Sequence, residues 1–189
     1  MNRSFTEQEQ FRKIDFTANG FPKGEYERCE FHNCNLSGID LGLTIFSECR
    51  FEDCDFSNAK LGATSFREVD FVKCKLLGLR FDECNKLLIS FSFNTCVLNF
   101  SSFFRLKIKN TSFRECKLHE TDFVETDLTK AVFHNCDLQG AIFENTILEG
   151  ADLRAAYNFS IHPETNKIAK ARFSTAGLAG LLDRYLVIE

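Results

Sequence analysis

The chain contains no tryptophan, no run of eighteen apolar residues and no charged-then-apolar segment at its start. A membrane-spanning helix needs about 20 consecutive apolar residues, and a secretory leader places a basic stretch before an apolar one. Because both features are absent, we expect a soluble, cytoplasmic protein with no membrane partner. With 189 residues and 44% hydrophobic content, the chain is long enough to bury one continuous core.

The sequence also lacks a recognisable catalytic arrangement. No serine or cysteine has a base at a predictable distance, and the histidines are widely separated: His32, His119, His134 and His162. The nine cysteines contain no C-x-x-C pair of the kind that binds zinc, and their closest spacing is C-x4-C. We therefore expect no enzyme, no cofactor and no metal site.

What the sequence does contain is a bulky apolar residue at every fifth position. These centres run from Phe16 to Phe81 and, after a slip of two residues, resume from Leu88 to Leu153. A period of five matches neither the 3.6 of a helix nor the 2 of a strand, so it indicates an internal repeat. Two residues before most centres stands a cysteine, threonine or alanine, and all nine cysteines share that place.

This pattern, A/C/T-D/N-L/F-x-x, resembles the motif of the pentapeptide repeat family over roughly residues 16–155. The resemblance implies an all-β fold, the right-handed quadrilateral β-helix, with four pentapeptides in each coil. Residues twenty apart should then stack, and such a column is present: Phe31, Phe51, Phe71, Phe93, Phe113 and Phe133, with the slip between the third and fourth. The centres predict about seven coils and, at ~4.8 Å per coil, a tower ~34 Å tall.

A narrow, filled shaft explains the use of cysteine and the lack of tryptophan. Nine thiols are an odd number, and threonine or alanine replaces them elsewhere in the repeat, so we expect buried, reduced thiols rather than disulfides. An indole would leave its N–H without a partner in such a shaft. A filled shaft also leaves no cavity for a small ligand.

The pattern divides the chain into three parts. Residues 1–15 precede the repeat, and Phe11 and Ile14 are expected to cap the first coil. Residues 16–155 are expected to form the β-helix, with the slip at 84–88 bulging from one corner; a functional loop there is the alternative. Residues 156–189 should form a loop, an extended stretch and a short helix with Ser174 as its N-cap.

Because sequence position becomes height in a stack, charge along the chain becomes charge along the axis. Residues 86–114 contain five basic residues and no acid, whereas residues 115–152 contain nine acids and two lysines. We call the nine acids the acidic band and regard them as candidate partner-binding residues: Glu115, Glu120, Asp122, Glu125, Asp127, Asp137, Glu144, Glu149 and Asp152. Random drift of surface charge is the alternative explanation.

The C-terminal segment has an apolar face at helical spacing. Its candidate dimerisation residues are Leu178, Leu181, Leu182, Tyr185 and Leu186. A short helix is marginal alone, and its apolar content exceeds what one cap needs, so we expect a homodimer through this segment. The tail P-E-T-N-K-I at 163–168, followed by A-G-L, also resembles the Qnr and McbG type of gyrase-protecting members. The resemblance implies a dimer through the C-terminal ends and a rod proposed to mimic duplex DNA.

Two hypotheses of function follow. The first is a DNA mimic that protects a type II topoisomerase such as DNA gyrase, giving quinolone or microcin resistance; the acidic band near the expected dimer end supports it. The five basic residues within 86–114, which we call the basic band, and the lack of long inserted loops oppose it. The second is a repeat scaffold for protein–protein interaction with no topoisomerase or nucleic-acid role. Direct binding to nucleic acid is not expected of a chain with net charge −4.

Overall fold

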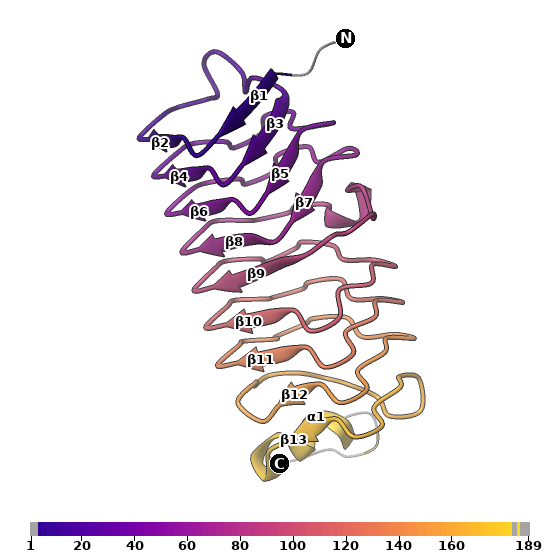
Figure 1. Ribbon diagram of the computed structural model, residues 1–189. Coiled ribbons are helices and arrows are strands. Elements are labelled where there is room, and N and C mark those ends of the chain that lie inside the picture. The colour runs from indigo at the N-terminus through magenta and orange to yellow at the C-terminus, as the bar shows by residue number, and fades with distance from the viewer. Residues whose placement is uncertain (1–3, 183–184, 186–189) are drawn as a thin grey trace.

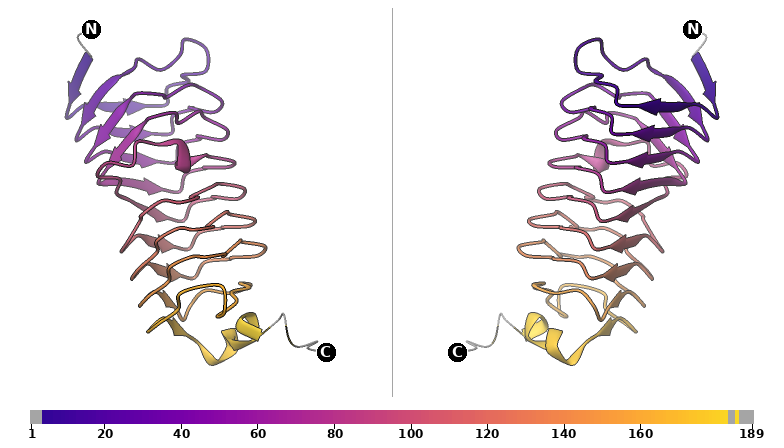
Figure 2. Two further views of the ribbon diagram at one scale, coloured as in Figure 1. Left: turned by 90° about the vertical axis from the view of Figure 1, so that its right-hand side faces the viewer. Right: turned by 90° about the vertical axis from the view of Figure 1, so that its left-hand side faces the viewer.

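The computed structural model describes residues 4–182 and 185. The chain winds into a tower of stacked coils, a right-handed parallel β-helix of about eight turns with one short C-terminal helix (Figure 1). Two side views show the coils lying one above another, with the first coil and the helix at opposite ends (Figure 2). The predicted fold class is therefore confirmed, with about one coil more than the seven expected.

Two parallel sheets run along the tower, and each strand pairs with the strands of neighbouring coils. The first sheet has four strands: β1 (Ser4–Glu7), β3 (Gly24–Glu27), β5 (Ile45–Ser47) and β7 (Ser65–Arg67). The second has nine: β2 (Gln10–Arg12), β4 (Glu30–His32), β6 (Arg50–Glu52), β8 (Val69–Val72), β9 (Phe91–Asn94), β10 (Ser112–Arg114), β11 (Val132–His134), β12 (Asp152–Leu153) and β13 (Arg172–Phe173). The register is one coil per twenty residues, as in the pairing of Phe31 with Phe51. Isolated bridges such as Asn35 to Asp55 hold the other faces.

The corners of the coils explain the period of five. About once in five residues the backbone enters the left-handed region, as at Asn33 (φ 54°), Leu43 (φ 67°) and Glu48 (φ 53°). A non-glycine residue pays roughly 1–2 kcal/mol for this conformation. Hydrogen bonds between coils offset that cost, because the corner N–H of Asn33 donates to the carbonyl of Glu52 at 2.9 Å and that of Glu48 to Arg67 at 2.8 Å. The stack therefore holds conformations that isolated turns would avoid.

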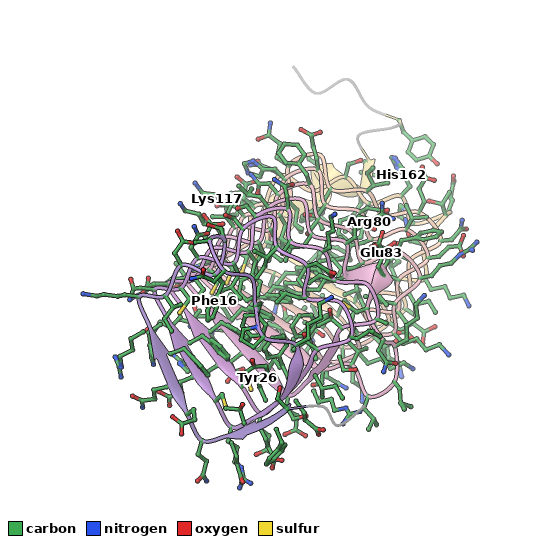
Figure 3. The ribbon with its side chains drawn as sticks, turned by 90° about the horizontal axis from the view of Figure 1, so that it is seen from above. Phe16, Tyr26, Arg80, Glu83, Lys117 and His162 are labelled. Carbon is green, nitrogen blue, oxygen red and sulfur yellow. The ribbon has the colours of Figure 1, made fainter. Side chains whose placement is uncertain are left out.

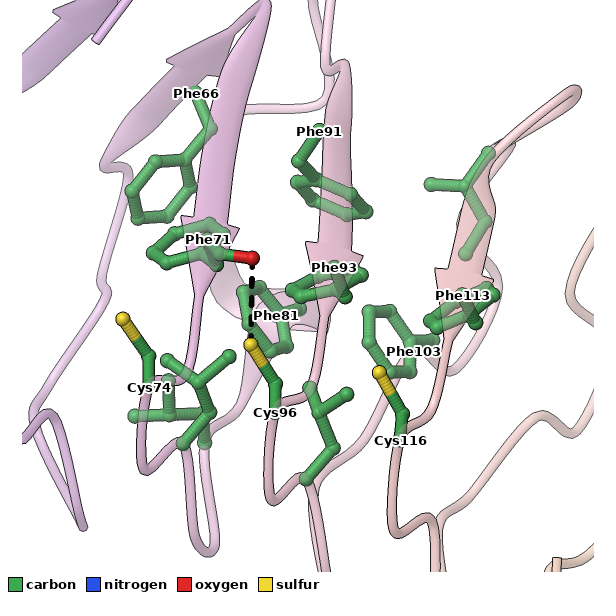
Figure 4. Packing of buried hydrophobic residues seen from close by; sticks show 14 of the residues in the cluster. Phe66, Phe71, Cys74, Phe81, Phe91, Phe93, Cys96, Phe103, Phe113 and Cys116 are labelled. Atoms are coloured by element: carbon green, nitrogen blue, oxygen red, sulfur yellow. Dashed lines mark hydrogen bonds between the residues drawn. The ribbon is translucent and has the colours of Figure 1, made fainter. Parts of the chain in front are cut away.

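The interior consists of aromatic columns (Figure 4). In one column the ring of Phe93 stacks on those of Phe71 and Phe113, with centroids 5.4 and 5.2 Å apart and planes within 12°. In the neighbouring column Phe81 stacks on Phe103 at 4.8 Å. The columns meet edge to face, since the planes of Phe93 and Phe103 differ by 76°. Offset stacks and edge-to-face pairs are both favourable geometries for phenyl rings.

The small residue that stands two positions before each centre often donates a side-chain hydrogen bond. Cys96 Sγ donates to the carbonyl of Phe71 at 3.3 Å (Figure 4), and Thr126 Oγ1 donates to that of Phe103 at 2.8 Å. Each donor therefore reaches a carbonyl of the preceding coil. Cysteine and threonine are interchangeable at this position because both are small and both donate a hydrogen bond. All nine thiols are free and buried, as the repeat pattern predicts.

The N-terminal residues differ from the expected cap. Strands β1 and β2 pair with β3 and β4 in the regular register, which places Phe11 opposite Phe31. Their rings stack at 4.6 Å, whereas Ile14 is exposed. Residues 4–12 thus belong to an additional coil, because Phe11 stands twenty residues before Phe31 and extends the phenylalanine column upward. The weaker five-residue pattern before Phe16 concealed this.

The slip changes the register from twenty to twenty-two residues, since Phe71 pairs with Phe93. The slip follows the 3-10 turn η1 (Phe81–Glu83). The four-stranded sheet ends at β7, in the coil directly above the slip. Counting back five from Phe93 predicts Leu88 as an inward centre, and this is wrong: Leu88 is exposed and Ile89 packs against the core. Phe91 stands where most repeats have a small residue, and the core accommodates its ring, which is buried with its centroid 5.4 Å from that of Phe81.

The slip also interrupts the ladder on one face. Above it, residues 85 and 90 donate to the carbonyls of Thr64 and Phe66. Below it, no backbone hydrogen bond of the described chain joins residues 85–90 to residues 105–110. The nine-stranded sheet nevertheless passes through this level, from β8 to β9 to β10.

The C-terminal segment closes the last coil. Ser174 caps the 3-10 turn η2 (Thr175–Leu178) by accepting a hydrogen bond from the N–H of Gly177 at 3.1 Å, and α1 (Ala179–Leu182) follows. Gly180 lies so close to Phe159 that a Cβ there would stand 2.2 Å from the Phe159 carbonyl oxygen. Glycine is therefore required for this contact. None of the helices in the described residues is long and apolar enough to cross a membrane.

Candidate interaction surface

Side chains with nitrogen and oxygen atoms at their tips point outward around the tower, as the view from above shows (Figure 3), whereas the aromatic rings at the centres of the repeat are buried inside it. Function must therefore lie on this outer surface. No group of three or more histidine, cysteine or acidic residues that could hold a metal ion is found among residues 4–182 and 185. His32, His119 and His134 lie on separate coils, and His162 lies in the loop that follows the repeat.

The basic and acidic bands meet through stacked ion pairs. Arg105 forms a two-bond pair with Glu125, with N···O distances of 2.7 and 3.0 Å, and Lys109 Nζ lies 3.2 Å from Asp127 Oδ2. The Arg105 hydrogen bond lowers the pKa of Glu125. Both arginine and glutamate are exposed, and exposed pairs contribute only about 0–1 kcal/mol to stability. Their main effect is to neutralise part of the acidic band.

Two further acids of the band have close basic neighbours. His119 Nε2 lies 2.8 Å from Asp137 Oδ2, a pair that is ionic when the imidazole is protonated. Arg154 binds Asp152 with an N···O distance of 2.6 Å. The hydrogen bond from Arg154 lowers the pKa of Asp152 to about 2. Four of the nine predicted acids are therefore engaged with basic side chains.

The other five acids, within the described residues, make no ion pair: Glu115, Glu120, Asp122, Glu144 and Glu149. Asp122 and Glu144 lie on one face of the tower, since Asp122 bridges to Ile142 in the next coil. Glu120 occupies the preceding corner, with φ of 52°. The structure thus gathers Glu120, Asp122 and Glu144 into what we call the acidic strip, and it leaves Glu115 and Glu149 at other corners and faces.

The predicted dimerisation residues do not all share one environment. Leu181 packs partly buried against the core of its own chain, while Leu178, Leu182 and Tyr185 are exposed. Leu186 lies outside the described residues. One side of the helix therefore serves as the cap of the last coil, and the other presents an apolar surface at the end of the tower.

The sequence pattern suggested a functional loop at 84–88 only as an alternative, and it did not single out the exposed leucines of the slip. Leu87 and Leu88 are both largely exposed, and a groove lies beside them. The sequence carried a signal, since two adjacent leucines stand inside the only break of the repeat. Their direction could not be read from spacing, because Leu87, Leu88 and Ile89 are all apolar.

Taken together, stacked coils of twenty residues with a closed core and a polar exterior define a repeat solenoid. Within that class, the chain belongs to the pentapeptide repeat family: the family model "Pentapeptide repeats (8 copies)" matches residues 27–62, 49–85, 107–145 and 131–160, more than half of the chain. A comparison with curated protein sequences gives no match.

Several solved structures are similar to this chain. HetL, a pentapeptide repeat protein involved in heterocyst differentiation regulation from the cyanobacterium Nostoc sp. strain PCC 7120, is 17% identical, with 92% of this chain and 88% of that chain covered and a TM-score of 0.53. QnrB1, a plasmid-mediated fluoroquinolone resistance protein, is 19% identical in a trypsin-treated form, with 98% of both chains covered and a TM-score of 0.41. Rfr23 from the cyanobacterium Cyanothece 51142 is 19% identical, with 79% and 88% covered and a TM-score of 0.38. At these identities the likeness concerns the fold alone.

Proposed function

We propose that the protein is a non-enzymatic interaction protein that occupies the DNA-binding surface of a partner with its acidic strip, and that a type II topoisomerase such as DNA gyrase is the partner to test. The observation that carries this proposal is the grouping of Glu120, Asp122 and Glu144 on neighbouring coils without ion pairs. Coils ~4.8 Å apart hold such charges at fixed spacing. Fixed negative charge is what a DNA-binding groove attracts.

The proposal includes a homodimer through the C-terminal end. Leu178, Leu182 and Tyr185 are exposed there, and a two-fold contact would bury this apolar surface on both chains. Such a contact would place two acidic bands in line on either side of the dimer axis. The resulting rod would be about twice as long as one tower.

The test measures drug-stabilised cleavage complexes of gyrase, with and without this protein at a few micromolar. We expect the wild type to lower their level and the triple variant Glu120→Gln, Asp122→Asn, Glu144→Gln to lose this effect. Binding should also weaken as salt rises, since the contact is electrostatic.

A matched control removes three acids from upper coils: Glu9→Gln, Glu25→Gln and Asp53→Asn. It has the same net charge as the triple variant and should keep the wild-type effect. Equal losses in both variants would mean that net charge alone matters. Unchanged cleavage complexes together with no binding to gyrase would rule out the topoisomerase proposal.

The dimer is tested separately by sedimentation. Leu182→Asp should give monomers, because a charge would be buried in the interface, and it should lose the effect on gyrase as well. Tyr157→Asp changes another exposed apolar side chain on the side of the tower and should stay dimeric. A monomeric wild type, or a dimeric Leu182→Asp variant, would contradict the dimer.

The repeat scaffold remains the second candidate, and one observation favours it. Pairs such as Arg105 with Glu125 and Lys109 with Asp127 already neutralise part of the acidic band. A surface of alternating charge suits recognition of a particular protein better than mimicry of a uniformly charged polymer. Under this alternative, the triple variant would bind the partner as the wild type does, and gyrase would not be retained on the immobilised protein.

A further inference from the structure

The slip opens a groove at the corner between the two sheets, where Glu48 follows β5 and precedes β6, whereas Glu120 of the acidic strip occupies a different corner of the coils. One part has a volume of about 450 Å³ and is lined by Glu48, Arg67, Glu68, Leu88 and Ile89 among others. A second part of about 490 Å³ shares Glu48 and Glu68 and continues around the corner onto the nine-stranded sheet. The two parts adjoin at Glu48 and Glu68, and together we call them the slip groove.

The leucines at the rim of this groove are not explained by stability. Leu88 is 69% exposed and has φ of 59°. A leucine in the left-handed region is disfavoured compared with asparagine or glycine. Leu87 beside it is also exposed. Two adjacent exposed leucines beside a concave surface are typical of a contact for another protein.

Two acids of the groove, Glu48 and Glu68, have no ion-pair partner within the described residues. They occupy the same corner of successive coils, with φ of 53° and 52°. Two like charges one coil apart repel each other. A cation placed between them would relieve that repulsion, and the open groove beside them gives it access.

Arg67 supplies a donor at the same place. Its Nε is buried and has no hydrogen-bond partner among the described residues. A buried polar group without a partner lowers stability by about 1–3 kcal/mol. A backbone carbonyl of a segment lying in the groove would satisfy this donor once the Arg67 side chain turns its Nε–H toward the groove.

We propose that the slip groove binds an extended segment of a partner protein in which a lysine or arginine stands next to an apolar residue. The basic side chain lies between Glu48 and Glu68, the apolar one packs on Leu88 and Ile89, and a main-chain carbonyl accepts from Arg67. This surface is distinct from the acidic strip and does not depend on the topoisomerase proposal.

The first experiment selects peptides from a displayed library of random dodecapeptides on the immobilised full-length chain. The selected sequences should be enriched in a basic residue beside an apolar one. Synthetic copies with a fluorescent label then give affinities by anisotropy. Leu88→Asn should weaken binding at least about tenfold, as loss of a central contact residue does, and asparagine tolerates the left-handed backbone.

Leu43→Asn is the matched control, because Leu43 is 58% exposed, also has positive φ, and does not line the groove. It should leave binding unchanged. The double variant Glu48→Gln, Glu68→Gln should weaken binding and reduce its salt dependence, whereas Glu115→Gln, Glu120→Gln should do neither. Melting curves by circular dichroism confirm that each variant is folded.

Three results would overturn the proposal. They are a selection without the basic–apolar pattern, the absence of any selected peptide, and binding that Leu88→Asn and the Glu48/Glu68 variant leave unchanged. Because the assay contains no topoisomerase, its failure and the failure of the proposed function are separate outcomes.

Discussion

Replacing Phe93 by alanine should cost about 3–5 kcal/mol of unfolding free energy, the range found for large aromatic truncations in cores. Phe93 is 1% exposed. Its ring lies within 6.1 Å, centroid to centroid, of five others: Phe71, Phe81, Phe91, Phe103 and Phe113. Each aromatic pair contributes about 0.5–1.5 kcal/mol beyond burial. The ladder fixes the backbone on either side, so the cavity cannot close and the upper half of the range is expected.

The measurement is urea unfolding followed by circular dichroism, with the slope of free energy against urea compared between variants. Phe100→Ala is the control, since Phe100 is 58% exposed and surface changes usually stay within about 0.5 kcal/mol. A loss below about 1.5 kcal/mol for Phe93→Ala at an unchanged slope would refute the rigid-shaft reasoning, because it would mean that the core relaxes into the space.

Two further predictions concern titratable groups. The nine thiols should resist labelling until denaturant is added, because all nine are buried and out of reach of the reagent, and burial also raises the pKa of the Cys49 thiol to about 12; rapid labelling of several thiols in the native protein would contradict this. The Arg154 hydrogen bond lowers the pKa of Asp152 from 3.8 to about 2. A depressed native pKa adds stability above pH ~3.8 that is lost as pH falls toward ~2. Arg154→Met should therefore flatten stability against pH in this window, measured by urea unfolding, and an identical acid loss in both proteins would exclude the contribution.

The column structure of the core could be predicted from the sequence because it depends on spacing alone. The twenty-residue recurrence of phenylalanine predicted the pairing of Phe31 with Phe51, and the two-residue slip predicted that of Phe71 with Phe93. The inward place of the cysteines followed from the same count. Each of these is a local rule repeated many times, so a single irregular unit does not obscure it.

The spacing of the repeat does not determine which residue of the slip faces inward or how long the C-terminal helix is. Within the slip, either Leu88 or Ile89 could face inward, and the structure selects Ile89 because the insertion moves the corner. The spacing predicted a short helix after Ser174, and within the described chain this segment begins with the 3-10 turn η2 before α1 follows with four residues. The ion pair of Arg105 with Glu125 could have been predicted, because the two residues are twenty apart and therefore stack. From the sequence alone, the basic and acidic bands were considered only as separate heights along the axis.

The interrupted ladder at the slip has a mechanical consequence. Backbone hydrogen bonds that run along the axis resist stretching of the tower. Below the slip, the described chain lacks them on one of the four faces, between residues 85–90 and 105–110. Bending that opens that side stretches no backbone hydrogen bond there, whereas bending in any other direction must strain an intact ladder such as the β8–β9 pairing. The tower is therefore two stiff segments with a preferred direction of flexure between them, and a load applied at one end would tilt the upper coils away from the face that carries Leu87 and Leu88.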